Sequence, residues 1–119
     1  MTESTPESAS ESLREQMERA IREVPVLLFT KGNKHFPRCG FSKAVIDLFA
    51  ELDVPFQTVD IFQHPDVKPT LVEITGWPTT PQIFIGGEFI GGGDVVREMH
   101  ARGELEPLVR EALARAEAS

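Results

Sequence analysis

The chain has 119 residues, 40% of them hydrophobic, which suits one domain that builds its core without metal or disulfide. Its 12 basic and 19 acidic residues give a formal charge of −7, which argues against a nucleic-acid binder and against docking on anionic membranes. The one cysteine, Cys39, excludes an internal disulfide and a metal site made of several thiolates from one chain. A reactive thiol, a buried inert thiol and a ligand shared between chains stay open.

The N-terminal residues have the composition of a disordered tail. Residues 1–10 are acidic and polar, so we expect disorder there and a single domain over residues 11–117. The start of the chain lacks the pattern of a secretory signal or a transit peptide, and no apolar run is long enough for a membrane helix. The cytoplasm, a reducing compartment, is the expected location.

The first half of the chain predicts a helix, a strand and a loop. Apolar residues at helical spacing predict a helix from about Ser12 to Glu23, and Ser12 with Glu15 has the form of a capping box. The continuous apolar run 26–29 predicts a strand buried on both faces. Residues 31–38 contain glycine, asparagine and proline, which predict a loop.

Further elements follow in alternation. A helix is predicted from Cys39 or Gly40 to a point before Pro55, then a strand over residues 56–61 and a helix that opens at residues 64–66. This β-α-β order predicts two parallel strands joined by a right-handed crossover.

The last part of the chain predicts a hairpin and two helices. Residues 82–90 form two apolar runs around Gly86-Gly87, the pattern of a hairpin with a two-residue turn. Asp94 is expected to cap a helix, and a final amphipathic helix follows Gly103. The whole order predicts an α/β fold: a four-stranded mixed sheet with helices on both faces and an additional N-terminal helix.

The position of Cys39 indicates a reactive thiol. A helix N-terminus favours an anion, and Lys31 and Arg38 add positive charge nearby, so the thiol pKa is expected to fall. A buried inert cysteine is the competing interpretation. Ser42 stands where a Cys-x-x-Cys pair has its second sulfur, so any disulfide chemistry must take its second thiol from solution, and glutathione is the abundant cytosolic source.

Four blocks of sequence resemble one family. They are Phe29–Gly32, Pro37–Ser42, Trp77–Gln82 and Gly91–Asp94, and they occur in the family's order. On these blocks the chain resembles the monothiol glutaredoxins of the Cys-Gly-Phe-Ser class, over about residues 13–114. The resemblance implies the thioredoxin fold, glutathione binding and a [2Fe–2S] cluster held between two subunits.

The resemblance to that family also implies how the cluster is shared. A [2Fe–2S] cluster needs four ligands, and two chains with one cysteine each plus two glutathione thiols supply them. The implied function is therefore an iron–sulfur carrier that forms a cluster-bridged homodimer and serves assembly machinery and client apo-proteins. The alternatives are a glutathione-dependent thiol–disulfide oxidoreductase, of weak activity at most, and a regulatory heterodimer with a BolA-like protein.

The resemblance assigns roles residue by residue. Cys39 is the implied iron ligand and catalytic thiol, while Trp77 is expected to shape the wall of the site. The residues implied to bind glutathione are Lys31 and Lys68 (glycine carboxylate), Phe41 (packing), Thr80 and cis-Pro81 (cysteinyl backbone), and Gly93 and Asp94 (γ-glutamyl group). Simpler interpretations are a solvated lysine for Lys31, an N-cap for Asp94 and an ordinary turn at Thr80–Pro81.

The sequence departs from the family's pattern at two positions. Lys68 stands where members commonly have arginine, so the charge remains but the bidentate fork is lost. Gly93 stands where many members have cysteine, which excludes a regulatory disulfide with Cys39. The loop 32–38 resembles the longer loop of the monothiol class, which the resemblance associates with cluster binding over fast oxidoreduction.

Overall fold

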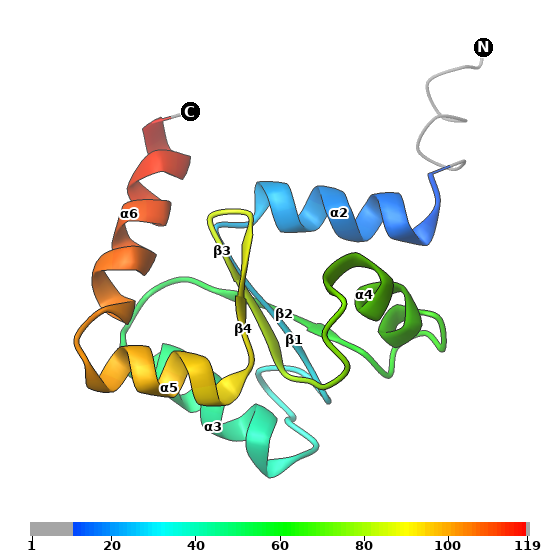
Figure 1. Cartoon of the computed structure of the whole chain (residues 1–119), viewed down its shortest axis with the longest axis horizontal. Helices are drawn as coiled ribbons and strands as arrows, with labels where there is room; N and C mark the ends of the chain where they lie inside the picture. Colours follow the sequence, from blue (N-terminus) through cyan, green and yellow to red (C-terminus); the bar gives the residue numbers. More distant parts are fainter. Residues whose placement is uncertain (1–10, 119) are drawn as a thin grey trace.

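The structure, a computed structural model, describes residues 11–118, so the predicted acidic tail (1–10) lies outside the described residues. Helices and strands alternate along the first half of the chain and end in a hairpin and two helices (Figure 1). The elements are α2 (Leu13–Glu23), β1 (Val26–Thr30), α3 (Gly40–Glu51), β2 (Gln57–Asp60), α4 (Val67–Thr75), β3 (Gln82–Ile85), β4 (Glu88–Gly91), α5 (Gly93–Ala101) and α6 (Leu105–Ala118).

The four strands form one mixed sheet in the order β2-β1-β3-β4. β1 pairs with β2 in parallel and with β3 in antiparallel, and β3 and β4 form the hairpin. Phe29 of β1 lies opposite Val59 of β2 on one side and Gln82 of β3 on the other. The mixed four-stranded sheet predicted from the order of elements is confirmed.

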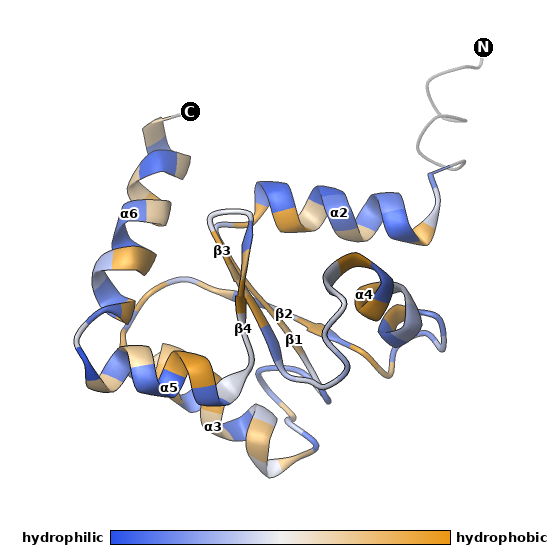
Figure 2. Cartoon of the chain, in the orientation of Figure 1, coloured by the Kyte–Doolittle hydropathy of each residue, from blue (hydrophilic) through white to orange (hydrophobic). Residues whose placement is uncertain are grey.

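Helices cover both faces of the sheet, as expected (Figure 1). Leu27 and Phe29 of β1 belong to the core under α2 and α4, whereas Val26 and Leu28 belong to the core under α3, α5 and α6. Because successive side chains of a strand point to opposite faces, a strand covered on both sides is apolar throughout. Figure 2 shows this hydrophobic centre, with the outward faces of the helices hydrophilic.

The two predicted helix caps have different outcomes. The capping box of α2 is confirmed: Ser12 Oγ accepts the Glu15 N–H, and Glu15 Oε1 accepts the Ser12 N–H. The expected N-cap role of Asp94 is wrong, because the N-cap of α5 is Gly92 and Asp94 is the second residue of the helix. The Asp94 carboxylate is therefore not the cap of the helix and pairs with Arg97 instead. No helix within residues 11–118 is long and apolar enough to cross a membrane.

Candidate functional site

The loop before Cys39 closes on itself at the end of β1. Gly32 and Pro37 form a β-bridge, and the Arg38 N–H donates to the Lys31 carbonyl at 2.8 Å. Gly32 has φ +83°, and a Cβ there would overlap the Phe36 carbonyl oxygen, so the tight closure requires glycine. Although seven residues separate Lys31 from Cys39, closure brings the two ends of the loop together.

Asp60, at the end of β2, fixes this loop against the sheet. Its Oδ1 accepts hydrogen bonds from the Gly32 N–H at 3.0 Å and from the Phe62 N–H at 2.9 Å. The buried Thr30 hydroxyl donates to the Gly32 carbonyl at 2.8 Å from the other side. The loop is therefore held by two neighbouring strands, a role for Asp60 that the sequence alone did not show.

Cys39 is the N-cap of α3, as its expected place at a helix start requires. Its Sγ accepts the Ser42 backbone N–H at 3.3 Å and lies 3.4 Å from Ser42 Oγ. Ser42 is fully buried, and its Oγ also accepts the Lys31 backbone N–H at 3.0 Å. Since that contact uses an acceptor site of the hydroxyl, the Ser42 proton is free to point at the sulfur.

These contacts lower the pKa of the Cys39 thiol below its ordinary value. Partial burial raises the pKa, but the Ser42 hydroxyl, the N–H groups of Ser42 and Phe41 and the charge of Lys31 together outweigh it. A lower pKa means more thiolate at neutral pH, and the thiolate is both the nucleophile and the metal ligand. The structure therefore favours a reactive thiol over inert core filler.

A pocket of about 390 Å³ lies beside this helix start, between α3, α4, the 77–81 segment and α5. Cys39 is not among its lining residues, but Phe41, two residues further along, is. All seven residues expected to bind glutathione line this one pocket: Lys31, Phe41, Lys68, Thr80, Pro81, Gly93 and Asp94. The structure thus brings together residues from five separate parts of the chain.

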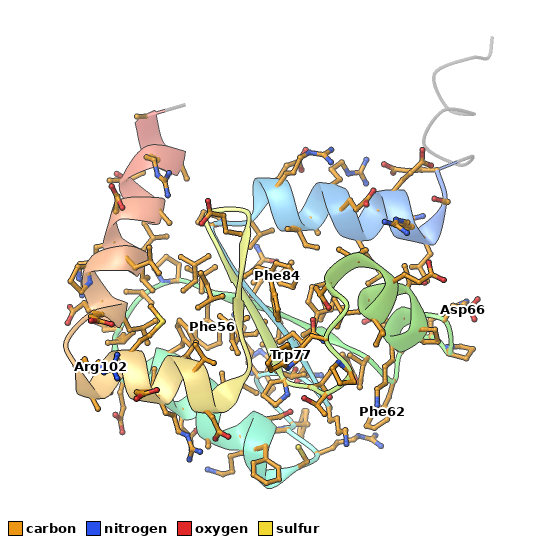
Figure 3. The ribbon with its side chains drawn as sticks, in the orientation of Figure 1. Phe56, Phe62, Asp66, Trp77, Phe84 and Arg102 are labelled. Carbon is orange, nitrogen blue, oxygen red and sulfur yellow. The ribbon has the colours of Figure 1, made fainter. Side chains whose placement is uncertain are left out.

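The floor and wall of the pocket come from the turn before β3. The Thr80–Pro81 peptide bond is cis, as expected. Gln82, fully buried, donates from Nε2 to the Trp77 carbonyl at 2.9 Å and to the Thr79 carbonyl at 3.0 Å. The ring of Trp77, labelled in Figure 3, meets the ring of Phe89 edge-on, with centroids 5.9 Å apart. Trp77 thus forms a wall of the pocket, in line with the sequence-based expectation.

The pocket lacks a side chain where α5 begins. A Cβ at Gly93 would lie 3.1 Å from Val45 Cγ2, and one at Gly92 would lie 3.5 Å from both the Pro81 carbonyl oxygen and Trp77 Nε1. Glycine here lets the backbone N–H groups of the helix start approach a ligand closely. Unpaired N–H groups at a helix N-terminus favour a bound anion.

Basic residues gather around the thiol in an otherwise acidic chain. Residues 31–46 include four of the 12 basic residues and none of the 19 acidic ones. Lys31 and Lys68 both line the pocket, and neither forms a salt bridge with another residue in the described part of the chain. Arg38 does not line the pocket, whereas Lys31, Lys68 and Arg97 do.

Some lining residues were not predicted from the sequence. Arg97, on α5, lines the pocket and pairs with Asp94, with Arg97 Nη2 at 2.6 Å from Asp94 Oδ1. The spacing of three residues on one helix was the available signal for this pair. The other unpredicted lining residues are Ala44, Val45, Thr79, Gly92 and Val95.

The imidazoles and carboxylates of the described residues form no cluster that could hold a metal ion. Within residues 11–118, no group of three or more His, Cys, Asp or Glu side chains is placed to hold a metal ion. His35, His64 and His100 are exposed.

Comparisons with known proteins agree with this fold and site. The family model for glutaredoxin matches residues 26–90. Glutaredoxin 4 of Escherichia coli K12 is 43% identical over 101 residues, which are 85% of this chain and 88% of that protein. Chloroplastic monothiol glutaredoxin-S14 of Arabidopsis thaliana is 41% identical over 101 residues, 85% of this chain and 58% of its own length.

Two solved structures are also similar. Reduced apo GrxS14 from poplar has a TM-score of 0.77 and 36% identity, covering 90% of this chain and 98% of that one. A buckwheat glutaredoxin–glutathione complex has a TM-score of 0.75 and 31% identity, covering 94% and 96%. The sheet, its helices and the thiol at a helix start define a thiol protein of the thioredoxin fold. The chain belongs to the glutaredoxin family, as a monothiol member.

Proposed function

We propose that this protein binds glutathione and a [2Fe–2S] cluster shared between two subunits, and carries the cluster from assembly machinery to client apo-proteins. The observation that carries the proposal is the single activated thiol. Cys39 has a lowered pKa, Ser42 stands where a resolving cysteine would be, and a pocket lined by two lysines lies alongside. Such a thiol needs a partner thiol from solution, and the pocket offers a place for it.

Glutathione fits the pocket from end to end. Its glycine carboxylate pairs with Lys31 and Lys68, the two pocket-lining cations that form no salt bridge within residues 11–118. The backbone N–H and C=O of Thr80, which precedes cis-Pro81, hydrogen-bond to the backbone of the cysteinyl residue of glutathione as a short β-bridge. Gly93 and Asp94 hold the γ-glutamyl group at the start of α5, and the exposed Phe41 packs along the tripeptide. This orientation directs the glutathione thiol toward Cys39.

The cluster is cargo, and the donor set of one chain fits half of it. The chain has one cysteine, half-buried and with a lowered pKa, which suits a thiolate that ligates iron. Two chains and two glutathiones complete four thiolate ligands, and this count makes the holo form a homodimer. Since two ligands are small molecules, the cluster is released more easily than from four protein cysteines. A heterodimer with a BolA-like partner would use the same thiol.

A second candidate function rests on the same thiolate. As an oxidoreductase, Cys39 thiolate attacks the glutathione sulfur of a protein mixed disulfide, and the protein leaves as its thiolate. A second glutathione thiolate then attacks the glutathione sulfur of the Cys39 mixed disulfide, giving oxidised glutathione and regenerating Cys39. The partial exposure of Cys39 and its lowered thiol pKa favour this chemistry too. Both functions suit a reducing compartment such as the cytoplasm.

Anaerobic reconstitution separates the two functions. The protein is mixed with iron, sulfide and glutathione, and its absorption, its size and its turnover of a glutathione mixed disulfide are recorded. A carrier gives a coloured dimer only when glutathione is present, with slow turnover. A colourless monomer with brisk turnover of the mixed disulfide would overturn the carrier function and support the oxidoreductase.

A further inference from the structure

An ion pair stands inside the pocket, where α5 begins. Arg97 Nη2 lies 2.6 Å from Asp94 Oδ1, and both residues line the pocket. The Asp94 side chain is 91% exposed and that of Arg97 is 53% exposed, so both can reach a ligand. The family resemblance implied a role in glutathione binding for Asp94 but not for Arg97.

The pair leaves most of its hydrogen-bonding capacity unused. One guanidinium nitrogen meets one carboxylate oxygen, and neither side chain makes another hydrogen bond within residues 11–118. An arginine fork offers five N–H donors, and a carboxylate offers two oxygens. A ligand can therefore join both partners without breaking the pair.

The two ends of the pocket differ in charge pattern. Toward β1 and α4, Lys31 and Lys68 present positive charge and form no salt bridge within the described part of the chain, which suits a lone carboxylate. At the other end, a cation and an anion stand side by side, which suits a group that carries both charges on one carbon. The γ-glutamyl end of glutathione is such a group, with an α-carboxylate beside an α-ammonium.

We propose that Arg97 determines specificity by binding the α-carboxylate of the γ-glutamyl group while Asp94 binds its ammonium. This inference rests on the proposed binding of glutathione. The N–H groups at the start of α5 favour the same carboxylate, so Arg97 adds a directed contact to a site that already attracts an anion. The pocket then selects thiols that carry an intact γ-glutamyl end.

A similar ion pair on the same helix serves as the control. Arg102 pairs with Glu98 at 2.8 Å, with side chains 62% and 64% exposed, and neither lines the pocket. Figure 3 labels Arg102 at the far end of α5 from Trp77 and the pocket wall. Arg102→Ala therefore removes one positive charge and one exposed ion pair from α5 without touching the site.

Two glutathione analogues of equal net charge separate the ends of the ligand. Glutathione glycinamide keeps the α-carboxylate and loses the glycine carboxylate, whereas 4-aminobutyryl-Cys-Gly does the reverse. Binding of glutathione and of both analogues is measured by calorimetry with the full chain. The variants are Arg97→Ala, Arg97→Lys and Arg102→Ala, with Lys68→Ala as the probe of the opposite end.

Arg97→Ala should weaken glutathione and its glycinamide by roughly five- to tenfold, the range of an exposed charge-assisted contact, and leave 4-aminobutyryl-Cys-Gly within about twofold. Lys68→Ala should show the opposite pattern, Arg97→Lys an intermediate loss, and Arg102→Ala none. Equal weakening of both analogues, or tighter binding by Arg97→Ala, overturns the inference. If the unaltered protein bound no glutathione at all, the proposed function itself would fail, which is a distinct result.

Discussion

The backbone N–H of Lys31 donates to Ser42 Oγ at 3.0 Å, and this one hydroxyl lies 3.4 Å from the sulfur of Cys39. Ser42 thus links the end of β1 to the thiol at the start of α3. In this chain, the residue that replaces a resolving cysteine has a structural role of its own. The Ser42 hydroxyl holds the end of the loop by accepting the Lys31 N–H, and it also lowers the pKa of the Cys39 thiol.

Ser42→Ala should raise the pKa of Cys39 toward its ordinary value, because a hydrogen bond to the thiolate is lost. The partly buried Lys31 N–H also loses its acceptor, so unfolding free energy should fall by about 1 kcal/mol. The thiolate absorbance against pH and the alkylation rate of Cys39 report the pKa. Ser12→Ala, which removes another serine hydroxyl that accepts a backbone N–H, should lower stability and leave the thiol pKa unchanged.

The lowered pKa of the Cys39 thiol also predicts how the free energy of unfolding changes with pH. Because the folded protein favours the thiolate, stabilisation from Cys39 is fully present above the unfolded pKa and is lost as pH falls through the folded pKa. Unfolding free energy, followed from neutral to alkaline pH, should therefore rise more in the parent protein than in Cys39→Ser. Identical pH profiles would contradict the lowered pKa.

Gly32→Ala should destabilise the protein by more than about 1 kcal/mol, because φ is +83° and the new Cβ would overlap the Phe36 carbonyl oxygen. Denaturant unfolding measures the loss. Gly40→Ala is the matched control, since nothing lies within 4 Å of its Cβ position and the residue opens a helix, where alanine is favoured. If Gly32→Ala were as stable as Gly40→Ala, the loop closure described here would be wrong.

The sequence predicted most of the fold for a physical reason. Helical spacing, the buried apolar run 26–29 and the Gly86-Gly87 turn are local signals, and their order fixes the pairing of strands. The capping box of α2 was also local. The N-cap of α5 was misplaced at Asp94 because a run of three glycines precedes it, and glycine gives no side-chain signal for where a helix begins.

The site was predictable only where single residues carry the chemistry. The seven residues expected to bind glutathione were named from the sequence, and they line one pocket of the structure, while their roles remain predictions. The supporting contacts of Asp60 and Gln82 were not found, because each depends on a partner brought close by the fold rather than by spacing along the chain. Arg97 had a local signal in its spacing from Asp94, but only the pocket gives that pair a function.

Lys68→Arg should tighten glutathione binding about two- to threefold, because a guanidinium fork binds a carboxylate through two hydrogen bonds and an ammonium does not. Lys68 is exposed and makes no ion pair with another described residue, so the change has room and disturbs no existing contact. Calorimetric titration with glutathione measures it. Lys43→Arg, on the outer face of α3 and paired with Asp47, should change nothing. A weaker Lys68→Arg complex would show that Lys68 is not at the glycine carboxylate.

Gln82→Leu should loosen the wall of the pocket, because the hydrogen bonds to the Trp77 and Thr79 carbonyls are lost. Gln82 Oε1 is buried and has no hydrogen-bond partner among residues 11–118, so leucine also removes an unsatisfied acceptor, and unfolding free energy should change by only about 1 kcal/mol. The fluorescence of Trp77, the one tryptophan of the chain, should shift, and glutathione should bind severalfold more weakly. Gln16→Leu, which loses an exposed amide-to-carbonyl bond, should leave both readouts unchanged.

The composition of the holo protein tests the central claim most directly. Native mass spectrometry of the anaerobically reconstituted protein should show two chains, two glutathiones and one [2Fe–2S] cluster, with one Cys39 from each chain as ligand. Cys39→Ser should remain an apo monomer under the same conditions. A cluster retained by Cys39→Ser, or a holo dimer without glutathione, would contradict the account.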